Sequence, residues 1–169
     1  MPEPHPAMLP IDELLDSCEI KTTRRGGPGG QHRNKVESAI VITHLPTAVV
    51  GQAGERRSQH ENRRVAIDRL RLNLALEVRR KIPVTESLTE LWKSRIGGRR
   101  INVSSEHADF AALLAEALDF LQAHQFEVSA AAKALNLSNS QLIKFLKTEP
   151  AGLIWLNQKR SDLGLHPLK

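Results

Sequence analysis

The chain has 169 residues, 40% of them hydrophobic, and a formal net charge of +5, so one or two small domains with a real core are expected. Its single cysteine, Cys18, excludes an intramolecular disulfide and is typical of a protein of the reducing cytoplasm. No apolar run reaches the roughly 18 residues of a membrane span, and Met1–Pro10 lacks the basic and apolar runs of a signal or transit peptide. We therefore expect a cytoplasmic protein without a membrane partner.

The charge is distributed unevenly along the chain. Residues 1–20 carry five acidic and no basic residues, residues 21–81 carry 14 basic and 5 acidic ones, and residues 82–169 are nearly neutral. A block of about 60 residues with a net charge of +9 indicates contact with a nucleic acid. Because aromatic residues make up only 4% and tyrosine is absent, recognition of single-stranded RNA by base stacking is disfavoured.

The first half of the chain predicts a small antiparallel sheet followed by a helix. Alternating apolar and β-branched residues, turn residues and a period of three to four mark its elements. They are a short helix at Ile11–Asp16, strands at Glu19–Arg24, Val36–His44 and Ala48–Gln52, a turn at Leu45–Thr47, and a long helix from Ser58 that ends before Pro83. This order predicts an α+β domain over residues 1–82.

The second half predicts a connector over residues 83–104, with a short helix at Glu86–Arg95, and a helical module over residues 105–169. Ser104-Ser105-Glu106 resembles a helix cap before an apolar stripe that starts at Phe110. Further helices are expected at Ala130–Leu135, with Asn136 left-handed, at Leu142–Lys147 behind a Ser138 cap, and after Pro150. The middle pair resembles a DNA-binding helix-turn-helix, but its low charge favours a plain helical hairpin.

Between the first two predicted strands lies a glycine-rich segment flanked by basic residues. Four glycines and Pro28 occupy residues 26–30, and Gly29-Gly30-Gln31 forms its tip. No helix or strand interior tolerates this composition, because glycine permits positive φ and proline removes a donor. No Gly-Lys-Ser/Thr follows, so a nucleotide-binding P-loop is not indicated. A flexible hairpin tip or linker remains the alternative for these residues taken alone.

The string Gly27-Pro28-Gly29-Gly30-Gln31-His32 is followed in register by Asn34-Lys35, Ile42-Thr43-His44-Leu45-Pro46-Thr47 and Arg57-Ser58-Gln59-His60. Over residues 17–80 the chain thereby resembles the catalytic domain of class I peptide-chain release factors and of stand-alone ribosome-rescue factors. The resemblance implies a peptidyl-tRNA hydrolase with Gly29, Gly30 and Gln31 as catalytic residues. The Gln31 backbone N–H would stabilise the oxyanion, as such a donor does in other sites, and its side chain would orient water.

The resemblance also implies partners: the ribosome at its large-subunit peptidyl transferase centre, rRNA, peptidyl-tRNA, and a methyltransferase that modifies Gln31. Neither a cofactor nor a metal is expected, since no zinc-type spacing of Cys and His occurs. His32 is open to a role as general base, although its place in the string favours positioning. The candidate RNA-binding residues are Arg24, Arg25, His32, Arg33, Lys35, Arg56, Arg57, Gln59, His60, Arg63 and Arg64.

Two departures from the family bear on function. The chain has no candidate region for the stop-codon-reading domains of full release factors, which favours codon-independent ribosome rescue. The flexible Lys/Arg-rich tail of stand-alone rescue factors is replaced by the nearly neutral module at 105–169, to which we assign the recognition of the ribosome. The alternatives are a non-catalytic ribosome-binding factor for quality control, assembly or hibernation, and a DNA-binding regulator that uses residues 129–147.

Overall fold

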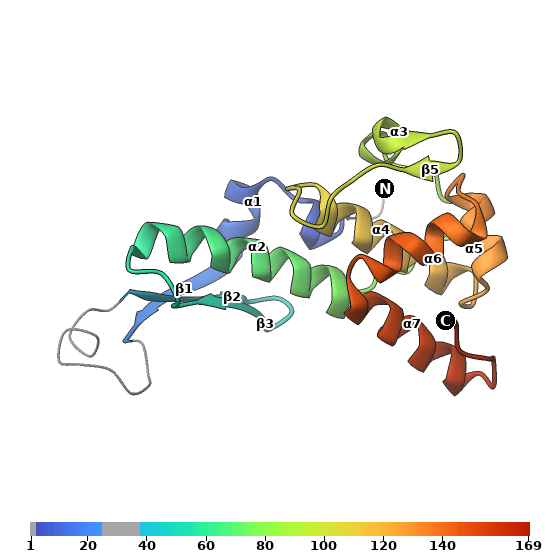
Figure 1. Ribbon diagram of the computed structural model, residues 1–169. Helices are drawn as coiled ribbons and strands as arrows, with labels where there is room; N and C mark the ends of the chain where they lie inside the picture. The colour runs from blue at the N-terminus through green and yellow to red at the C-terminus, as the bar shows by residue number, and fades with distance from the viewer. Residues whose placement is uncertain (1–2, 25–37) are drawn as a thin grey trace. The chain divides into compact units, whose positions relative to one another are not determined.

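The computed structural model describes residues 3–24 and 38–169 of the chain, which form two compact units (Figure 1). One unit comprises Pro6–Glu77 and is here called the sheet unit. The other comprises Met1–His5 and Val78–Lys169 and is called the helical unit. Within the described residues, none of the helices is both long enough and apolar enough to cross a membrane.

The sheet unit contains the predicted three-stranded antiparallel sheet. Strands β1 (Cys18–Thr23), β2 (Ala39–His44) and β3 (Val49–Ala53) lie in the order β1-β2-β3 (Figure 1). Ile42 pairs with Ile20 of β1 and with Gly51 of β3. β-branched residues fill β2 from Ile40 to Thr43, and burial alternates along β2 and β3, which gives these strands one buried face. The α+β fold class expected from the sequence is confirmed.

Helix α2 (Gln59–Glu77) covers the buried face of the sheet (Figure 1). The contact buries Ile40 and Ile42 of β2 together with Leu70 and Leu74 of the helix. At Gly51 the two backbones approach so closely that a Cβ there would lie 2.3 Å from the carbonyl oxygen of Ala66. Glycine is therefore required at this point of β3.

The two ends of α2 differ in how well the sequence predicts them. The Ser58 hydroxyl accepts from the Glu61 amide (3.3 Å), as expected for a helix cap. The helix ends at Glu77, before Pro83 as expected, although the sequence did not indicate which residue is the last. The side chain of Arg71 reaches the Ala7 carbonyl (3.0 Å) in the short 3₁₀ turn η1 (Pro6–Met8), which precedes α1 (Ile11–Asp16).

The helical unit is built from five helices and a small hairpin within its described residues. The first part comprises α3 (Glu90–Arg95) and strands β4 (Ile96–Gly97) and β5 (Arg100–Ile101). The second part comprises α4 (Phe110–Ala123), α5 (Val128–Ala134), α6 (Asn139–Lys147) and α7 (Pro150–Asp162) (Figure 1).

Two helices of this unit start later than the sequence predicted. Helix α3 begins at Glu90 because the Thr89 hydroxyl accepts from the Trp92 amide (3.1 Å) and caps it there. Helix α4 begins at Phe110, since the Ser104 hydroxyl accepts from the amide of Glu106 (3.2 Å) and forms a local turn instead of a cap. The predicted left-handed Asn136 (φ 55°) and the Ser138 cap of α6 are both confirmed.

The core of the helical unit surrounds α4, which is buried on all sides from Phe110 to Leu121. Trp92 is fully buried, donates through its indole N–H to the Leu135 carbonyl (2.9 Å) and meets Phe145 edge-on, with ring centroids 6.1 Å apart. The apolar side chains predicted to pack between α5 and α6 are buried: Leu135, Leu137, Leu142, Phe145 and Leu146.

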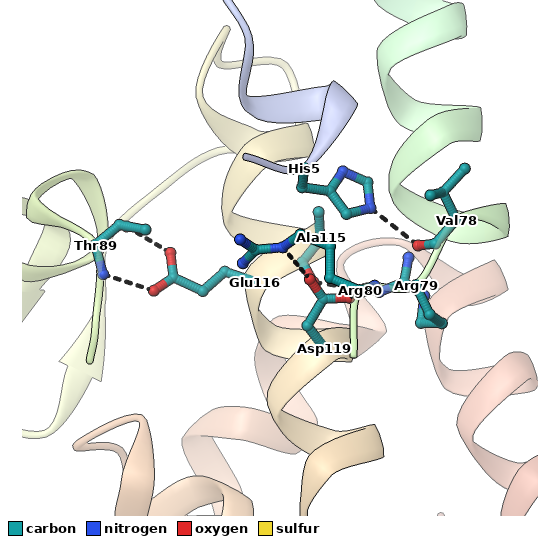
Figure 2. Close-up of polar contacts among 8 residues, drawn as sticks. All are labelled: His5, Val78, Arg79, Arg80, Thr89, Ala115, Glu116 and Asp119. Atoms are coloured by element: carbon teal, nitrogen blue, oxygen red, sulfur yellow. Dashed lines mark hydrogen bonds and ion pairs between the residues drawn. The ribbon is translucent and has the colours of Figure 1, made fainter. Parts of the chain in front are cut away.

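Two buried carboxylates of α4 hold the segments that precede it (Figure 2). Asp119, with no exposed surface, pairs with Arg79 (3.1 Å) and Arg80 (2.9 Å) and accepts from the Arg80 amide (3.0 Å). Glu116 accepts from the amide and hydroxyl of Thr89 at 2.9 and 2.5 Å. Burial raises the pKa of Glu116 and lowers that of Arg79 to about 10. These contacts explain why the chain leaves the helical conformation at residue 78.

The bounds of the two units differ from the predicted segments 1–82, 83–104 and 105–169. Residues 83–104, expected to be a connector, contribute the buried Trp92 to the helical unit. His5 also belongs to that unit and bonds the Val78 carbonyl through Nε2 (2.9 Å; Figure 2). The three-part division into separate domains stays a prediction.

Candidate functional site

The glycine-rich segment connects two neighbouring strands of the sheet. The predicted catalytic residues Gly29, Gly30 and Gln31, and the candidate RNA-binding residues Arg25, His32, Arg33 and Lys35, lie outside the described residues. Their described neighbours are Arg24, directly after β1, and Ser38, directly before β2. Thr23 and Ala39 are partners in the antiparallel register. Arg24 and Ser38, which flank the segment, therefore adjoin the same residue pair of the sheet.

Asn62 fixes one of these ends. This side chain of α2 has no exposed surface, and its amide donates to the carbonyl oxygens of Ser38 (2.6 Å) and Arg56 (3.0 Å). Its own oxygen accepts from the Arg56 amide (3.0 Å). Three hydrogen bonds from one buried amide therefore join the start of β2 to the turn that leads into α2.

Exposed arginines lie close in sequence to Asn62. Arg56 and Arg57 lie in the turn before α2, and Arg63 and Arg64 lie in its second turn. The amino end of a helix carries a partial positive charge, so cations gathered there repel it unless an anion is present. The arrangement suits a phosphate-rich partner. Gln59 and His60, the other candidates on α2, are exposed in its first turn.

An ion pair stabilises the turn between β3 and α2. Arg69 contacts Glu55 with both terminal nitrogens (2.5 and 3.3 Å) and donates to the Gln52 carbonyl (2.8 Å). The guanidinium of Arg69 and the Gly54 amide lower the pKa of Glu55 to about 2. The carboxylate therefore stays charged at any pH at which the protein functions, and the turn that carries Arg56 keeps its shape.

A shallow hollow of about 390 Å³ opens beside these residues. Thr23, Arg24 and Ala39 line it from the strand ends, and Gly54, Glu55 and Arg69 line it from the opposite side. Arg24, the described candidate directly after β1, thus lines one hollow together with residues of the turn before α2. Among the described residues, no group of three His, Cys, Asp or Glu is arranged to hold a metal ion.

The sequence reasoning missed two residues that build this region. No role was assigned to Asn62 from the sequence, yet it is buried beneath the strand end. Gly51 was read as part of an ordinary strand, although it allows the close approach of α2. An asparagine on the apolar side of a helix and a glycine inside a strand are the only signals the sequence offers for these two roles.

Comparison with known proteins identifies the family. The model of the RF-1 domain matches residues 11–107, which is more than half of the chain and longer at both ends than the predicted resemblance over residues 17–80. The chain belongs to the RF-1 domain family. The matched range contains the glycine-rich segment, the whole sheet, α2 and the start of the helical unit.

The curated relatives are similar over part of the chain. Peptide chain release factor 1 of Xylella fastidiosa is 42% identical over 100 residues, which cover 55% of this chain and 28% of that protein. Release factor 1 of Dictyoglomus thermophilum is 46% identical over 71 residues, 41% of this chain and 19% of that protein. Release factor 2 of Acidovorax sp. is 42% identical over 88 residues, 46% of this chain and 24% of that protein.

The chain thus spans 19–28% of the length of these three relatives. No solved structure matches it.

Proposed function

We propose that this protein binds the ribosome in the cytoplasm and hydrolyses the ester bond of peptidyl-tRNA, releasing nascent chains without reading a stop codon. The observation that carries the proposal is Gly29-Gly30-Gln31, which lies inside the range matched by the RF-1 domain and is followed in register by the other blocks of that family. The names of the relatives, peptide chain release factors 1 and 2, support release of a peptide as the reaction class.

The proposed chemistry requires positioning more than acid–base catalysis. Water attacks the ester carbonyl, negative charge develops on its oxygen, and the bond to the tRNA ribose breaks. The backbone N–H of Gln31 stabilises the oxyanion, an interaction whose loss typically costs about 100- to 1000-fold in rate. Gly29 and Gly30 permit the backbone geometry that presents this N–H. The Gln31 side chain orients the attacking water, and neither a metal nor a cofactor takes part.

The described residues support this proposal in two ways. Asn62 anchors the residue that precedes β2, so the catalytic segment starts from a defined point of the sheet. The exposed Arg24, Arg56, Arg57, Arg63 and Arg64 supply positive charge around that point, which suits rRNA close to the peptidyl transferase centre.

Codon independence is the finer part of the proposal. It supposes that the sheet unit and the helical unit together suffice for binding and release, with the helical unit directing the protein to its ribosomes. Residues 82–169 carry a nearly neutral total charge, whereas residues 21–81 carry a net charge of +9.

The test is peptide release from stalled ribosomes that carry no stop codon in the decoding site. The wild-type protein is expected to release the peptide, and Gly30→Ala and Gln31→Ala to lose most of the activity. Gly97→Ala is the matched control, because a Cβ there has open space around it. Release by Gly30→Ala at the wild-type rate would refute the mechanism. Ribosome binding without any release by wild type would favour a non-catalytic factor.

We also propose that Gln31 is N5-methylated by a glutamine methyltransferase of the host. A methyl group leaves the backbone donor intact while it limits the hydrogen bonds of the side chain. Mass analysis of the Gln31 peptide from native material is expected to show one added methyl group. An unmodified peptide would remove this proposal and leave the hydrolase proposal standing.

A further inference from the structure

Residues 82–169 are nearly neutral in total, but two ranges within them contain basic residues and no acidic ones. Residues 96–101 and 128–148 contain five basic residues and no acidic one: Arg99, Arg100, Lys133, Lys144 and Lys147. The first range is the β4–β5 hairpin and the second comprises α5, the following turn and α6. A surface free of carboxylates over two adjacent elements is a candidate for binding anions.

Four acidic residues of the unit are engaged elsewhere. Asp119 pairs with Arg79 and Arg80, Asp109 with Arg95, and Glu90 with Lys93. The carboxylate of Glu116 is bound by Thr89. In contrast, Arg100, Lys144 and Lys147 form no ion pair with any described residue, and all three are exposed. These four carboxylates are therefore bound by other residues of the unit and do not pair with the lysines of α6.

The hairpin is fixed against the turn that opens α6. The Ser138 amide donates to the Arg99 carbonyl (3.3 Å), and the Arg99 guanidinium donates through Nη2 to the Leu137 carbonyl (3.3 Å). Ser138 caps α6 by accepting from the Gln141 amide (3.2 Å). Arg99 and Arg100 are consequently held at the amino end of α6, although the turn between the strands is short and glycine-rich.

Helix α6 presents its lysines on the side opposite to its buried side chains. Leu142, Phe145 and Leu146 are at most 4% exposed. Ser140, Lys144 and Lys147 are exposed and lie four and three residues apart, which places them on one stripe of the helix. From its first to its last residue α6 extends about 12 Å. A basic track thus runs from Arg99 at the cap to Lys147 at the end.

We propose that Arg99, Arg100, Lys144 and Lys147, here called the α6 surface, bind the phosphate backbone of a double-stranded RNA segment of the ribosome. This inference rests on the proposed function, which supplies the ribosome as the source of the RNA. Lysines and a serine hydroxyl contact phosphate and ribose oxygens without reading bases.

RNA is favoured over DNA by the composition of the helix. An A-form major groove does not admit a helix, so contact is made across the shallow minor groove and its phosphates, for which small polar and lysine side chains suffice. Asn139, Ser140, Lys144 and Lys147 provide these groups along one short helix. The helix-turn-helix-like order of α5 and α6 is thereby used for backbone binding and not for reading a DNA sequence.

The test compares full-length variants in binding a 20-base-pair RNA duplex as the salt concentration is raised. Lys144→Gln/Lys147→Gln is expected to reduce the slope of log K against log salt by about 0.9 for each phosphate that the variant no longer neutralises. Lys144→Arg/Lys147→Arg should retain the wild-type slope. Lys93→Gln/Lys169→Gln removes the same charge from exposed positions outside the α6 surface and should also retain it.

Three outcomes decide the proposal. A lower slope in the Gln variant alone, with weaker co-sedimentation with ribosomes, supports it. An unchanged slope in that variant overturns it, as does tighter binding of a DNA duplex than of the RNA duplex. Because the duplex assay contains no ribosome, its result is independent of peptide release. A protein that binds the duplex through α6 but releases no peptide would refute the proposed function and leave the RNA-binding surface in place.

Discussion

The side-chain amide of Asn62 donates a 2.6 Å hydrogen bond to the carbonyl oxygen of Ser38, 24 residues earlier in the chain. Ser38 is the residue that precedes β2, and Asn62 lies in the first turns of α2. The bond therefore connects the end of the glycine-rich segment with the helix that carries the exposed arginines. The same side chain also satisfies the amide and the carbonyl of Arg56.

We predict that Asn62→Ala lowers the free energy of unfolding by about 2–4 kcal/mol, because each buried polar group left without a partner costs about 1–3 kcal/mol. Asn73→Ala is the matched control on the same helix. Its amide makes one bond to the Val50 carbonyl (2.7 Å) in an exposed position, so its loss should cost about 1 kcal/mol. Urea denaturation followed by circular dichroism measures both, and equal losses would contradict the anchoring role of Asn62.

Gly51→Ala is predicted to destabilise the sheet unit by about 3 kcal/mol or more, at the upper end of the cost of overpacking a core. The added methyl group would lie 2.3 Å from the Ala66 carbonyl and 2.4 Å from the Leu70 amide, both of them backbone atoms of α2. Helix and strand would have to separate to accept it. Gly97→Ala, at a position with open space, should leave the melting temperature nearly unchanged. Similar melting temperatures for the two variants would show that α2 can move away from β3 without loss of stability.

Local patterns predicted the elements whose signals lie close together in the chain. The alternation of β2, the Ser58 and Ser138 caps and the left-handed Asn136 each depend on residues within a few positions. The Gly-Gly-Gln string was found in the same way, through its order with later blocks. Such features are determined by short-range sterics and hydrogen bonds, which sequence reasoning can follow.

The features that sequence reasoning missed depend on partners far along the chain. Helix α2 was expected only to end before Pro83, and its end at Glu77 was not predicted: Arg79 and Arg80 bind Asp119, about 40 residues later. The start of α3 is fixed by the bonds from Thr89 to Glu116, 27 residues later. Burial of Asn62 follows from the position of Ser38. The hydrophobic periodicity and the composition of a segment do not indicate which distant element its side chains contact.

Asp119→Asn is predicted to lower the free energy of unfolding by about 3–5 kcal/mol, the usual cost of removing one partner of a buried ion pair. Asp119 has no exposed surface and binds two arginines, one of which, Arg79, is itself largely buried. Asp109→Asn is the control: its pair with Arg95 is partly exposed, and such pairs contribute about 0–1 kcal/mol. Chemical denaturation of the two variants should show the difference. A loss below about 1 kcal/mol for Asp119→Asn would mean that this buried pair contributes no more than an exposed one.

His5 is predicted to make stability depend on pH just below neutrality. Its ring has no exposed surface, and burial lowers its pKa below the ordinary 6.5, although Asp119 nearby opposes this effect and Arg79 and Arg80 add to it. The unfolded chain therefore binds a proton at His5 at a higher pH than the folded protein does. The contribution of His5 to the free energy of unfolding is fully present above pH 6.5. It falls as the pH is lowered towards the pKa of the folded protein, by at most about 1.4 kcal/mol per pH unit for one group.

The measurement is the free energy of unfolding at several values between pH 5 and 7.5 for wild type and His5→Gln. Gln can still donate to the Val78 carbonyl but does not titrate, so the variant should lose less stability than wild type below pH 6.5. Glu116, whose pKa is raised by burial, contributes stability that is lost as the pH rises above 4.5. It has the opposite sign and is present in both proteins, so it cancels in the difference. Parallel curves for wild type and His5→Gln would show that His5 does not titrate differently in the folded protein.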